Sequence, residues 1–421
     1  MFKRILILAG AAIVGFAACL ISVRKAGSWS FLPNRDLDRS ASYVKEVMKT
    51  VNENYVDGGA AGYDQLARLS LHGMVDSLDP HSQFLEAKDN EELEEDLTGE
   101  YGGIGVEVEV HKGAFSVITP IAGSPGDKAG ILLGDQIVSI DGTPVEHDVP
   151  MDKIVDRLRG KPHTHVRVGL LRPSDGRHMD LDLVREVIKV VSIRGTRVIE
   201  GTNTGYIEIQ EFNDHTGEQF DEALNQLLRK GIDSLVIDLR NNPGGPLDAA
   251  VEVAEPFFKK DDLIVYYQGR KATDRENYLS ETEGEPIRIP VAVLINDLTA
   301  SAAEIVAGAL KDACHAVVVG ERSYGKGSVQ TIFKLKNGEG LRLTTAHYFT
   351  PSGALINAKG IEPQVEVVMT PDEDEKIEQQ ISRPDITDAA QFRERFDFVP
   401  IEDRQLDAAV DVLRAARFLS R

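Results

Sequence analysis

The stretch Val291–Gln330 reads VAVLINDLTASAAEIVAGALKDACHAVVVGERSYGKGSVQ, and it decides the fold of this chain. It holds two apolar runs, VAVLIN and HAVVVG, on either side of a segment with helical spacing. This order predicts a βαβ unit with two parallel strands and a helix between them. Ser301 falls where the helix begins, and Lys326 falls in a glycine-flanked loop after the second strand.

Ser301 and Lys326 each follow a strand, so we expect both at one edge of the predicted sheet, where catalytic groups of α/β proteins gather. A serine hydroxyl is a weak nucleophile until a base removes its proton. A lysine can be that base if burial lowers its pKa, because desolvation disfavours the ammonium form. The free N–H groups of the helix N-terminus suit an oxyanion. The pattern therefore predicts acyl transfer by a serine–lysine pair.

Simpler interpretations exist for the same residues. Ser301 and Glu304 match the S-x-x-E pattern of a capping box, and Lys326 could be an ordinary loop lysine. His347 is an alternative base, although no acidic residue is placed by sequence to orient it. The loop SYGKGS lacks the frame of a phosphate-binding loop, so nucleotide binding is disfavoured.

The motif TASAAEIVAGAL, followed by GKGSVQ, resembles the carboxyl-terminal processing peptidases of the tail-specific protease family. These are Ser-Lys endopeptidases, and many carry an embedded PDZ domain. The resemblance implies that Ser301 is the nucleophile, that Lys326 is the general base and that Gln330 orients the lysine. It implies neither a metal nor a cofactor.

A second motif of the same family is DLRNNPGG, Asp238–Gly245, which begins in the last two residues of the apolar strand SLVIDL. By itself this segment is equally well a sharp turn. The resemblance implies that Gly244 or Gly245 supplies one oxyanion-hole N–H group and that Ala302 supplies the other. The sequence does not decide between the two glycines.

The region Tyr101–Val184 resembles a PDZ domain through YGGIGVEVE and GSPGDKAGILLGDQIVSIDG. Such domains bind the free C-terminus of a protein as an added strand. The resemblance implies that the loop Gly103, Ile104 and Gly105 holds the terminal carboxylate, with the predicted helix Met151–Leu158 as the far wall. Without the downstream motif, the loop would be an ordinary turn. From its position at the end of that helix, Arg159 is hypothesised to report peptide occupancy to the protease core.

The fold class is a multidomain α+β and α/β protein. The expected parts are a signal or anchor segment (1–25), an N-terminal helical region (34–98), the PDZ domain (99–185), a protease core (186–368), and an acidic linker with a C-terminal helix (369–421). The resemblance implies a core with a mixed sheet of the ClpP/crotonase type.

The formal charge of -21 over 421 residues argues against nucleic-acid binding, which needs clustered Lys and Arg. Residues Ile5–Val23 are uncharged and mostly apolar after Lys3 and Arg4, and the run is just long enough to span a bilayer. We expect a signal-anchor with the body outside the cytoplasm, in the periplasm or elsewhere in the bacterial cell envelope. Cleavage of this segment is the alternative.

The expected function is therefore a serine endopeptidase that recognises protein C-termini through its PDZ domain. The expected partners are protein and peptide substrates, a second copy of the chain or a higher oligomer, and an activating adaptor. A catalytically degenerate PDZ scaffold that binds C-terminal tails is the alternative function. Whether the PDZ domain activates or inhibits the core is left open.

Overall fold

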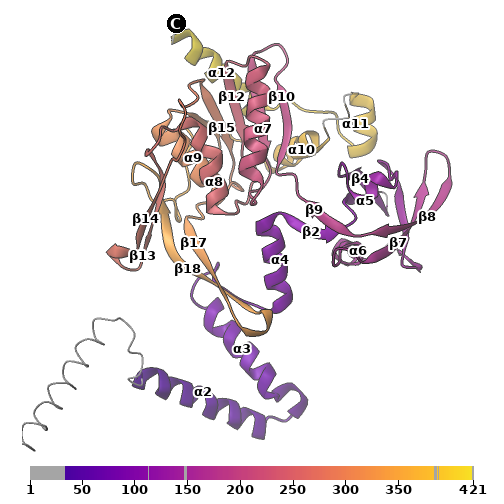
Figure 1. Cartoon of the computed structure of the whole chain (residues 1–421), viewed down its shortest axis with the longest axis vertical. Helices are drawn as coiled ribbons and strands as arrows, with labels where there is room; N and C mark the ends of the chain where they lie inside the picture. Colours follow the sequence, from indigo (N-terminus) through magenta and orange to yellow (C-terminus); the bar gives the residue numbers. More distant parts are fainter. Residues whose placement is uncertain (1–33, 112, 147–148, 384–385, 387, 420–421) are drawn as a thin grey trace, which may run out of the picture. The chain divides into compact units, whose positions relative to one another are not determined.

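A computed structural model describes residues 34–419 except 112, 147–148, 384–385 and 387 (Figure 1). The expected anchor segment, Ile5–Val23, lies outside the described residues. Among the helices that the structure does describe, none is long and apolar enough to cross a membrane. The chain divides into two units, Met1–Phe84 and Leu85–Arg421, which are taken in turn.

The first unit confirms the predicted N-terminal helices. Its elements are α2 (Arg35–Asn54), the 3-10 turn η1 (Gly58–Ala61) and α3 (Tyr63–Asp76), after which comes the short strand β1 (Gln83–Leu85). The Asn34 side chain caps α2 by accepting a hydrogen bond from the Leu37 N–H. No residue of α2 is buried, and large apolar side chains on both helices are exposed, among them Tyr43, Val47 and Met74. These helices therefore leave apolar surface accessible.

The second unit begins with a helix and a small β-structure. Its elements are α4 (Ala87–Thr98), β2 (Glu100–Gly103), β3 (Val106–His111), β4 (Ala114–Pro120), α5 (Pro125–Lys128), β5 (Gln136–Ile140), β6 (Thr143–Pro144), α6 (Met151–Leu158), β7 (His165–Arg172), β8 (Arg177–Val184) and β9 (Glu186–Lys189). Strands β3, β4, β5, β7 and β8 form one antiparallel sheet, and β2 pairs with β9. A core of its own, which includes Ile140, Ile154 and Val168, holds α6 on this sheet. The predicted groove helix is thus α6.

A mixed six-stranded sheet forms the centre of the remaining chain. Its strands are β10 (Ile193–Val198), β11 (Thr204–Ile209), β12 (Ser234–Asp238), β15 (Val291–Ile295), β16 (Val317–Gly320) and β19 (Val365–Glu366), in that order across the sheet. Only β10 runs antiparallel to its neighbour. The predicted βαβ unit is confirmed as β15, α9 (Ala302–Ala313) and β16.

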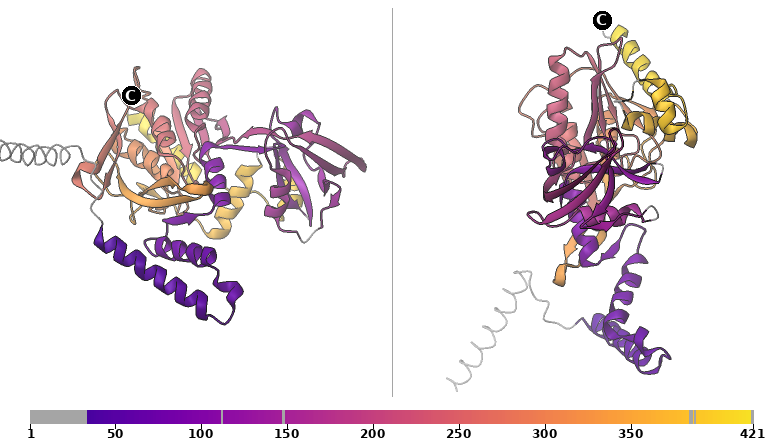
Figure 2. Two further views of the ribbon diagram at one scale, coloured as in Figure 1. Left: turned by 60° about the horizontal axis from the view of Figure 1, so that its bottom comes forward. Right: turned by 90° about the vertical axis from the view of Figure 1, so that its right-hand side faces the viewer.

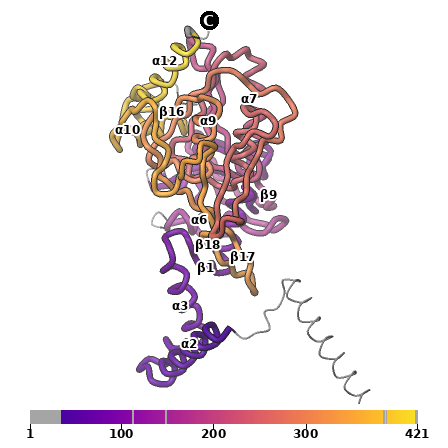
Figure 3. The backbone as a smooth tube through the Cα atoms, turned by 90° about the vertical axis from the view of Figure 1, so that its left-hand side faces the viewer, coloured from indigo at the N-terminus to yellow at the C-terminus, as the bar shows by residue number. Residues whose placement is uncertain are grey.

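Helices cover both faces of this sheet. One face packs against α7 (Thr216–Arg229), α8 (Leu247–Ala254, continued by η2, Glu255–Phe257) and α9 through one large apolar core. The other face, with Val236 and Leu294, packs against Ala409 and Leu413 of α12 (Arg404–Leu419). Figure 3 shows α7 and α12 on opposite sides of the sheet.

A second, antiparallel sheet lies beside the first. It contains β13 (Leu263–Gly269), β14 (Arg275–Leu279), β17 (Ser328–Lys334) and β18 (Gly340–Phe349), with the short turns η3 (Ala272–Asp274) and η4 (Lys336–Gly338) between them. Strands β17 and β18 form the long ribbon drawn in orange in Figure 2. Because β17 starts two residues after Lys326, this ribbon carries the lysine loop.

The C-terminal region differs from the expectation. The acidic stretch expected as a linker instead contains α10 (Pro371–Ser382), and α11 (Ala389–Phe396) follows it. Thr370 caps α10 through a capping box with Glu373, and the helix buries Ile377. A single buried residue on an otherwise acidic helix gives little apolar periodicity, so the linker prediction was wrong. The final helix is confirmed as α12.

Candidate active site

A cleft of about 880 Å³ collects most of the predicted catalytic residues. Ser301, Lys326, Gln330, Gly244 and Gly245 all line it, although they come from separate loops and strands. The walls are α4, the segment after β11, the start of α8, and the β17–β18 ribbon. The structure therefore brings together residues that lie far apart in the sequence.

Ser301 sits immediately before α9 with φ 56° and ψ −117°. A positive φ is uncommon for a residue with a side chain, and such strain gathers at functional sites. The preceding turn is held in place, because the Thr299 hydroxyl donates to the Leu239 carbonyl at 2.8 Å and the Ala300 N–H donates to the Asn242 carbonyl at 2.9 Å. The predicted capping box with Glu304 is present, and the Glu304 carboxylate accepts the Ser301 N–H. N-cap residues usually have backbone angles in the β region, so capping does not explain the positive φ of Ser301.

Glu304 ties the serine turn to the lysine loop. Its side chain is completely buried, and one carboxylate oxygen accepts the N–H groups of both Ser301 and Lys326 at 2.8 Å. The other oxygen accepts the Gly325 N–H at 2.7 Å and the Ser323 hydroxyl. Burial raises the pKa of Glu304, and these hydrogen bonds oppose that rise. The sequence analysis assigned this residue only a capping role; its S-x-x-E spacing gave no sign of the second loop.

Lys326 has the electrostatic setting that a lysine base needs. The side chain is half-buried, and burial together with the nearby Arg342 guanidinium lowers its pKa, while Glu304 raises it. Close packing explains the flanking glycines, because a Cβ at position 327 would lie 2.1 Å from the Asn357 nitrogen, and Gly325 has φ 90°. A lowered pKa increases the fraction of neutral lysine, the form that can accept a proton.

The two residues of the predicted serine–lysine pair line the same cleft but are not hydrogen-bonded to each other. Among the described residues, no hydrogen bond links Ser301 Oγ with Lys326 Nζ. Gln330 donates instead to the hydroxyls of Ser328 at 3.0 Å and Thr344 at 2.9 Å, and its buried Oε1 has no partner there. That free oxygen can accept a hydrogen bond from an ammonium group.

The two glycines of the DLRNNPGG segment differ in their hydrogen bonding. The Gly244 N–H already donates to Asn242 Oδ1 at 2.8 Å, whereas the Gly245 N–H has no acceptor among the described residues. Gly244 packs so closely that a Cβ on it would lie 2.6 Å from the Ser301 Cβ. The Ala302 N–H belongs to the first turn of α9 and has no acceptor within that helix. The free donors beside Ser301 are therefore those of Gly245 and Ala302.

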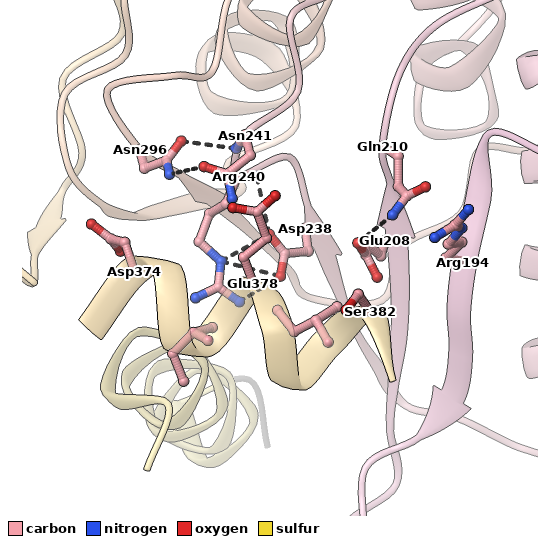
Figure 4. A pocket seen from close by; sticks show the side chains of 12 residues that line it. Arg194, Glu208, Gln210, Asp238, Arg240, Asn241, Asn296, Asp374, Glu378 and Ser382 are labelled. Carbon is pink, nitrogen blue, oxygen red and sulfur yellow. Dashed lines mark hydrogen bonds and ion pairs between the residues drawn. The ribbon is translucent and has the colours of Figure 1, made fainter. Parts of the chain in front are cut away.

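Behind this segment, Asp238 and Arg240 form an ion-pair network that the sequence analysis did not identify (Figure 4). The Arg240 guanidinium bonds both oxygens of Asp238 and reaches Asp403 at 2.9 Å. Next to it, Asn241 and Asn296 exchange hydrogen bonds at 2.7 and 2.9 Å. This network fixes the backbone that leads to the two glycines. Asp403 is far away in sequence, so no local motif could reveal the contact.

The network borders a second cavity, of about 310 Å³. Strand β10 contributes Arg194, β11 contributes Glu208, and Gln210 follows directly after β11. Helix α10 contributes carboxylates on the other side, as Figure 4 shows. Burial, followed by the charge of Asp238, raises the pKa of Glu208 to about 7. One oxygen of this carboxylate is buried without a hydrogen-bond partner among the described residues. Glu208 is thus the poorly satisfied group of an otherwise well-paired region.

The predicted alternative base lies elsewhere. His347 pairs with Ser328 in the β17–β18 ladder and is exposed, whereas its neighbour Tyr348 lines the cleft. Successive residues of a strand point to opposite faces, so His347 does not face the cleft. The geometry does not support a Ser-His pair.

The predicted peptide groove also exists, with a volume of about 330 Å³ between β3 and α6. Gly103, Ile104 and Gly105 line one end of it. The carbonyls of Ile104 and Gly105 accept hydrogen bonds from the N–H groups of Gly126 and Ile121, while their own N–H groups have no acceptor among the described residues. Gly105 has φ 68°, and free N–H groups in such a turn are able to bind an anion.

The fold and the cleft define a serine hydrolase with an α/β core and an embedded peptide-binding domain. Comparisons with known proteins identify the family to which this hydrolase belongs. The model of peptidase family S41 matches residues 203–367, and the PDZ domain model matches residues 117–172. The chain belongs to peptidase family S41 and is a serine peptidase with a PDZ domain before its protease core.

Curated relatives agree with this assignment. The chain is 38% identical over 307 residues to a carboxy-terminal-processing protease of Bartonella bacilliformis, covering 72% of this chain and 70% of the relative. It is 32% identical over 332 residues to the carboxy-terminal processing protease CtpB of Bacillus subtilis, covering 78% and 68%. It is 34% identical over 303 residues to CtpA of the same organism, covering 72% and 64%.

Proposed function

We propose that the protein is an endopeptidase in which Ser301 attacks the substrate carbonyl and Lys326 takes the serine proton. The single observation that carries this proposal is that Glu304 holds the backbones of both residues at one cleft. Lys326 then donates the proton to the leaving amine, and it activates the water that hydrolyses the acyl-enzyme. Gln330, through its free Oε1, orients the lysine during these steps.

The tetrahedral intermediate carries a negative oxygen that needs donors. Gly245 and Ala302 are the proposed donors, because Gly244 already uses its N–H for Asn242. Of the two glycines that the sequence left open, we therefore propose Gly245. This choice predicts that the Gly245 N–H points at the substrate oxygen once a substrate is bound.

The PDZ groove is proposed to hold the C-terminus of the substrate protein. The free N–H groups of Ile104 and Gly105 support this role, since a terminal carboxylate needs such donors. The groove then delivers a tethered chain to the cleft, which raises the effective concentration of the scissile segment.

The proposed setting is the bacterial cell envelope, with the body in the periplasm or another extracytoplasmic space. The support is the uncharged run Ile5–Val23 after Lys3 and Arg4. We further propose that α2 and α3 pair with the same helices of a second copy. Their exposed apolar side chains, such as Val47 and Met74, would be covered in such a dimer.

The test uses an unstructured reporter protein with an apolar, free-carboxylate C-terminus. Wild-type protein should cut it, and Ser301→Ala and Lys326→Ala should not. Lys336→Ala, which removes an exposed lysine outside the cleft, serves as the matched control and should stay active. Amidation of the reporter terminus should slow cleavage if the groove holds the carboxylate.

The alternative function is a PDZ scaffold without peptidase activity. It would bind the free C-terminus with the same affinity in wild type and Ser301→Ala, and neither would cut the reporter. Cleavage that appears only after addition of a cell-envelope extract would instead indicate an activating adaptor. Cleavage by Lys326→Ala at the wild-type rate would overturn the serine–lysine mechanism.

A further inference from the structure

One wall of the catalytic cleft carries carboxylates that the proposed mechanism does not use. Four acidic residues line it, namely Asp96, Glu211, Asp214 and Asp248. None of them forms an ion pair with a described residue. Glu94, a fifth acid of the cleft, differs because it pairs with Lys334 at 2.9 Å.

The chain positions these carboxylates next to the oxyanion segment. Glu211 precedes Phe212, whose N–H donates to the Gly244 carbonyl at 3.0 Å. Asp248 lies in the first turn of α8, three residues after Gly245. The acids are therefore anchored by backbone that borders the proposed oxyanion hole, so a substrate bound there passes close to them.

The remaining two acids are fixed on the same side. The Asp214 N–H donates to the Leu97 carbonyl of α4 at 3.1 Å, and Asp96 is the neighbour of Leu97. Asp96 also raises the pKa of the half-buried Glu211, after burial itself, so these two carboxylates lie close together. These four carboxylates of one cavity are called the acidic strip.

The chain has a large excess of acidic residues, so exposed carboxylates alone would mean little. This strip differs because it lines the same cavity as Ser301 and none of its four carboxylates forms an ion pair with a described residue. The cations that line this cavity, Lys326, Lys334 and Arg342, come from the lysine loop and the β17–β18 ribbon, and Lys334 is already paired with Glu94. Repulsion between unpaired carboxylates at a partly desolvated wall is unfavourable, and a cation in the cleft would relieve it.

We propose that this acidic strip selects substrate segments with a lysine or arginine within a few residues of the scissile bond, and that it disfavours acidic residues there. The inference rests on the proposed peptidase function of the cleft. It adds a charge preference of the cleft itself, separate from the choice of C-terminus by the PDZ groove. The substrate class is a chain that has a basic segment near its cleavage site and a free C-terminus.

The test uses three unstructured reporters that differ only at one position close to a single cleavage site, where they carry Lys, Gln or Glu. All three share the same C-terminal residues, so the PDZ contribution is constant. We expect kcat/KM of the full-length wild type to be about tenfold higher for the Lys reporter than for the Glu reporter at low salt. The ratio should fall toward one at 0.5 M salt, because exposed charges are then screened (roughly 4 Å screening length).

Two variants of equal charge locate the effect. The strip variant is Asp96→Asn, Asp214→Asn and Asp248→Asn. The control variant changes three exposed acids outside the cleft: Glu200→Gln, Glu222→Gln and Glu285→Gln. The strip variant should lose most of the Lys-over-Glu preference, and the control variant should keep it.

A binding measurement tests the charge preference independently of the proposed peptidase mechanism. Uncleaved Lys and Glu peptides without the C-terminal tail are titrated against Ser301→Ala, and binding is followed by fluorescence anisotropy. Tighter binding of the Lys peptide, lost with the strip variant, supports the charge preference even if cleavage requires a missing activator. Equal binding and equal cleavage of both peptides, or a preference that the strip variant retains, would overturn it. Cleavage of the Gln reporter by Ser301→Ala would instead count against the peptidase mechanism.

Discussion

Two cavities border the Asp238–Gly245 segment, and they differ in whether the polar groups that line them have hydrogen-bond or ion-pair partners. In the catalytic cleft, Gln330 Oε1 and the Gly245 N–H have no partner among the described residues. In the cavity behind the segment, Arg240 is bonded to carboxylates on two sides. Burying a polar group without a partner is unfavourable. The molecule thus leaves groups unpaired where a substrate can bond them and pairs the groups that hold the backbone.

The largest expected effect is on the rate of peptide cleavage and comes from a residue of the catalytic cleft. Lys326→Ala should lower kcat by about 10²- to 10⁴-fold, because this lysine takes the Ser301 proton in the proposed mechanism. Initial rates with the free-carboxylate reporter measure this loss. A drop below about tenfold would mean that another base serves Ser301, and the contrast between the two cavities would fail.

The pH dependence of the cleavage rate tests whether Lys326 is the base. Since Lys326 must be neutral to act as a base, activity should rise with pH through its pKa, which burial and Arg342 lower from 10.5. Arg342→Gln removes one of these causes, so the rising limb should move to higher pH. A limb that stays in place in this variant would show that the titrating group is not Lys326.

The next largest effect is expected on the stability of the protein, from the ion pairs behind the Asp238–Gly245 segment. Arg240→Ala leaves Asp238 and Asp403 without their shared cation, and breaking a buried ion pair in this way costs about 3–5 kcal/mol of the free energy of unfolding. Urea denaturation measures the change. The matched control is Arg167→Ala, whose partner Asp180 is exposed, and its cost should stay below about 1 kcal/mol. Equal losses in the two variants would contradict the supporting role.

Glu208 is the exception among the paired groups of the second cavity, and it should make stability depend on pH. Its pKa is about 7 in the folded protein, above the ordinary value of 4.5, so the folded state binds more protons between these pH values. Stability contributed by this group is present below pH 4.5 and is lost as pH rises through 7. Glu208→Gln should therefore stabilise the protein at pH 8 by on the order of 3 kcal/mol and have little effect at pH 4.5.

Thermal or urea unfolding at the two pH values measures this difference. Glu200→Gln, at an exposed position, is the matched control and should change stability equally little at both. A Glu208→Gln variant that is no more stable than wild type at pH 8 would show that the carboxylate finds a partner above pH 7. Glu208 would then no longer be an exception among the paired groups of the second cavity.

The sequence was sufficient for features that depend on local order. The strands and helix of Val291–Gly320 follow from apolar runs, and Ser301 and Lys326 follow from their place after two adjacent parallel strands. The groove helix α6 was likewise predicted from its residues. In each case the neighbouring residues determine the feature.

Features that depend on contacts distant in sequence could not be predicted in this way. Glu304 has a local spacing to Ser301, but its bonds to Gly325 and Lys326 cross from one loop to another. The Arg240–Asp403 pair joins residues separated by 163 positions. Helix α10 was missed because its stability comes from a cap at Thr370 and one buried residue, not from an apolar face.

The smallest expected effect concerns the link between the groove and the cleft. Arg159 lies over the Tyr101 ring at 4.3 Å and bonds Glu95 of α4 at 3.3 Å, and α4 also lines the catalytic cleft. These contacts motivate the hypothesis that a peptide in the groove acts on the cleft wall through this arginine. Arg159 and Glu95 are partly exposed, so the contact is worth no more than about 1 kcal/mol, or roughly a fivefold change in rate.

The measurement is the rate of cleavage of a short, amidated peptide with and without a separate tail peptide that fills the groove. In wild type the tail peptide should change this rate, and in Arg159→Ala the change should shrink. Lys153→Ala is the matched control, because Lys153 is exposed on α6, the helix that Arg159 follows. This variant should respond as wild type does. If Arg159→Ala responds fully, the groove and the cleft are connected by another route or act only through tethering. The two responses thus separate a structural signal from a mere increase in local concentration.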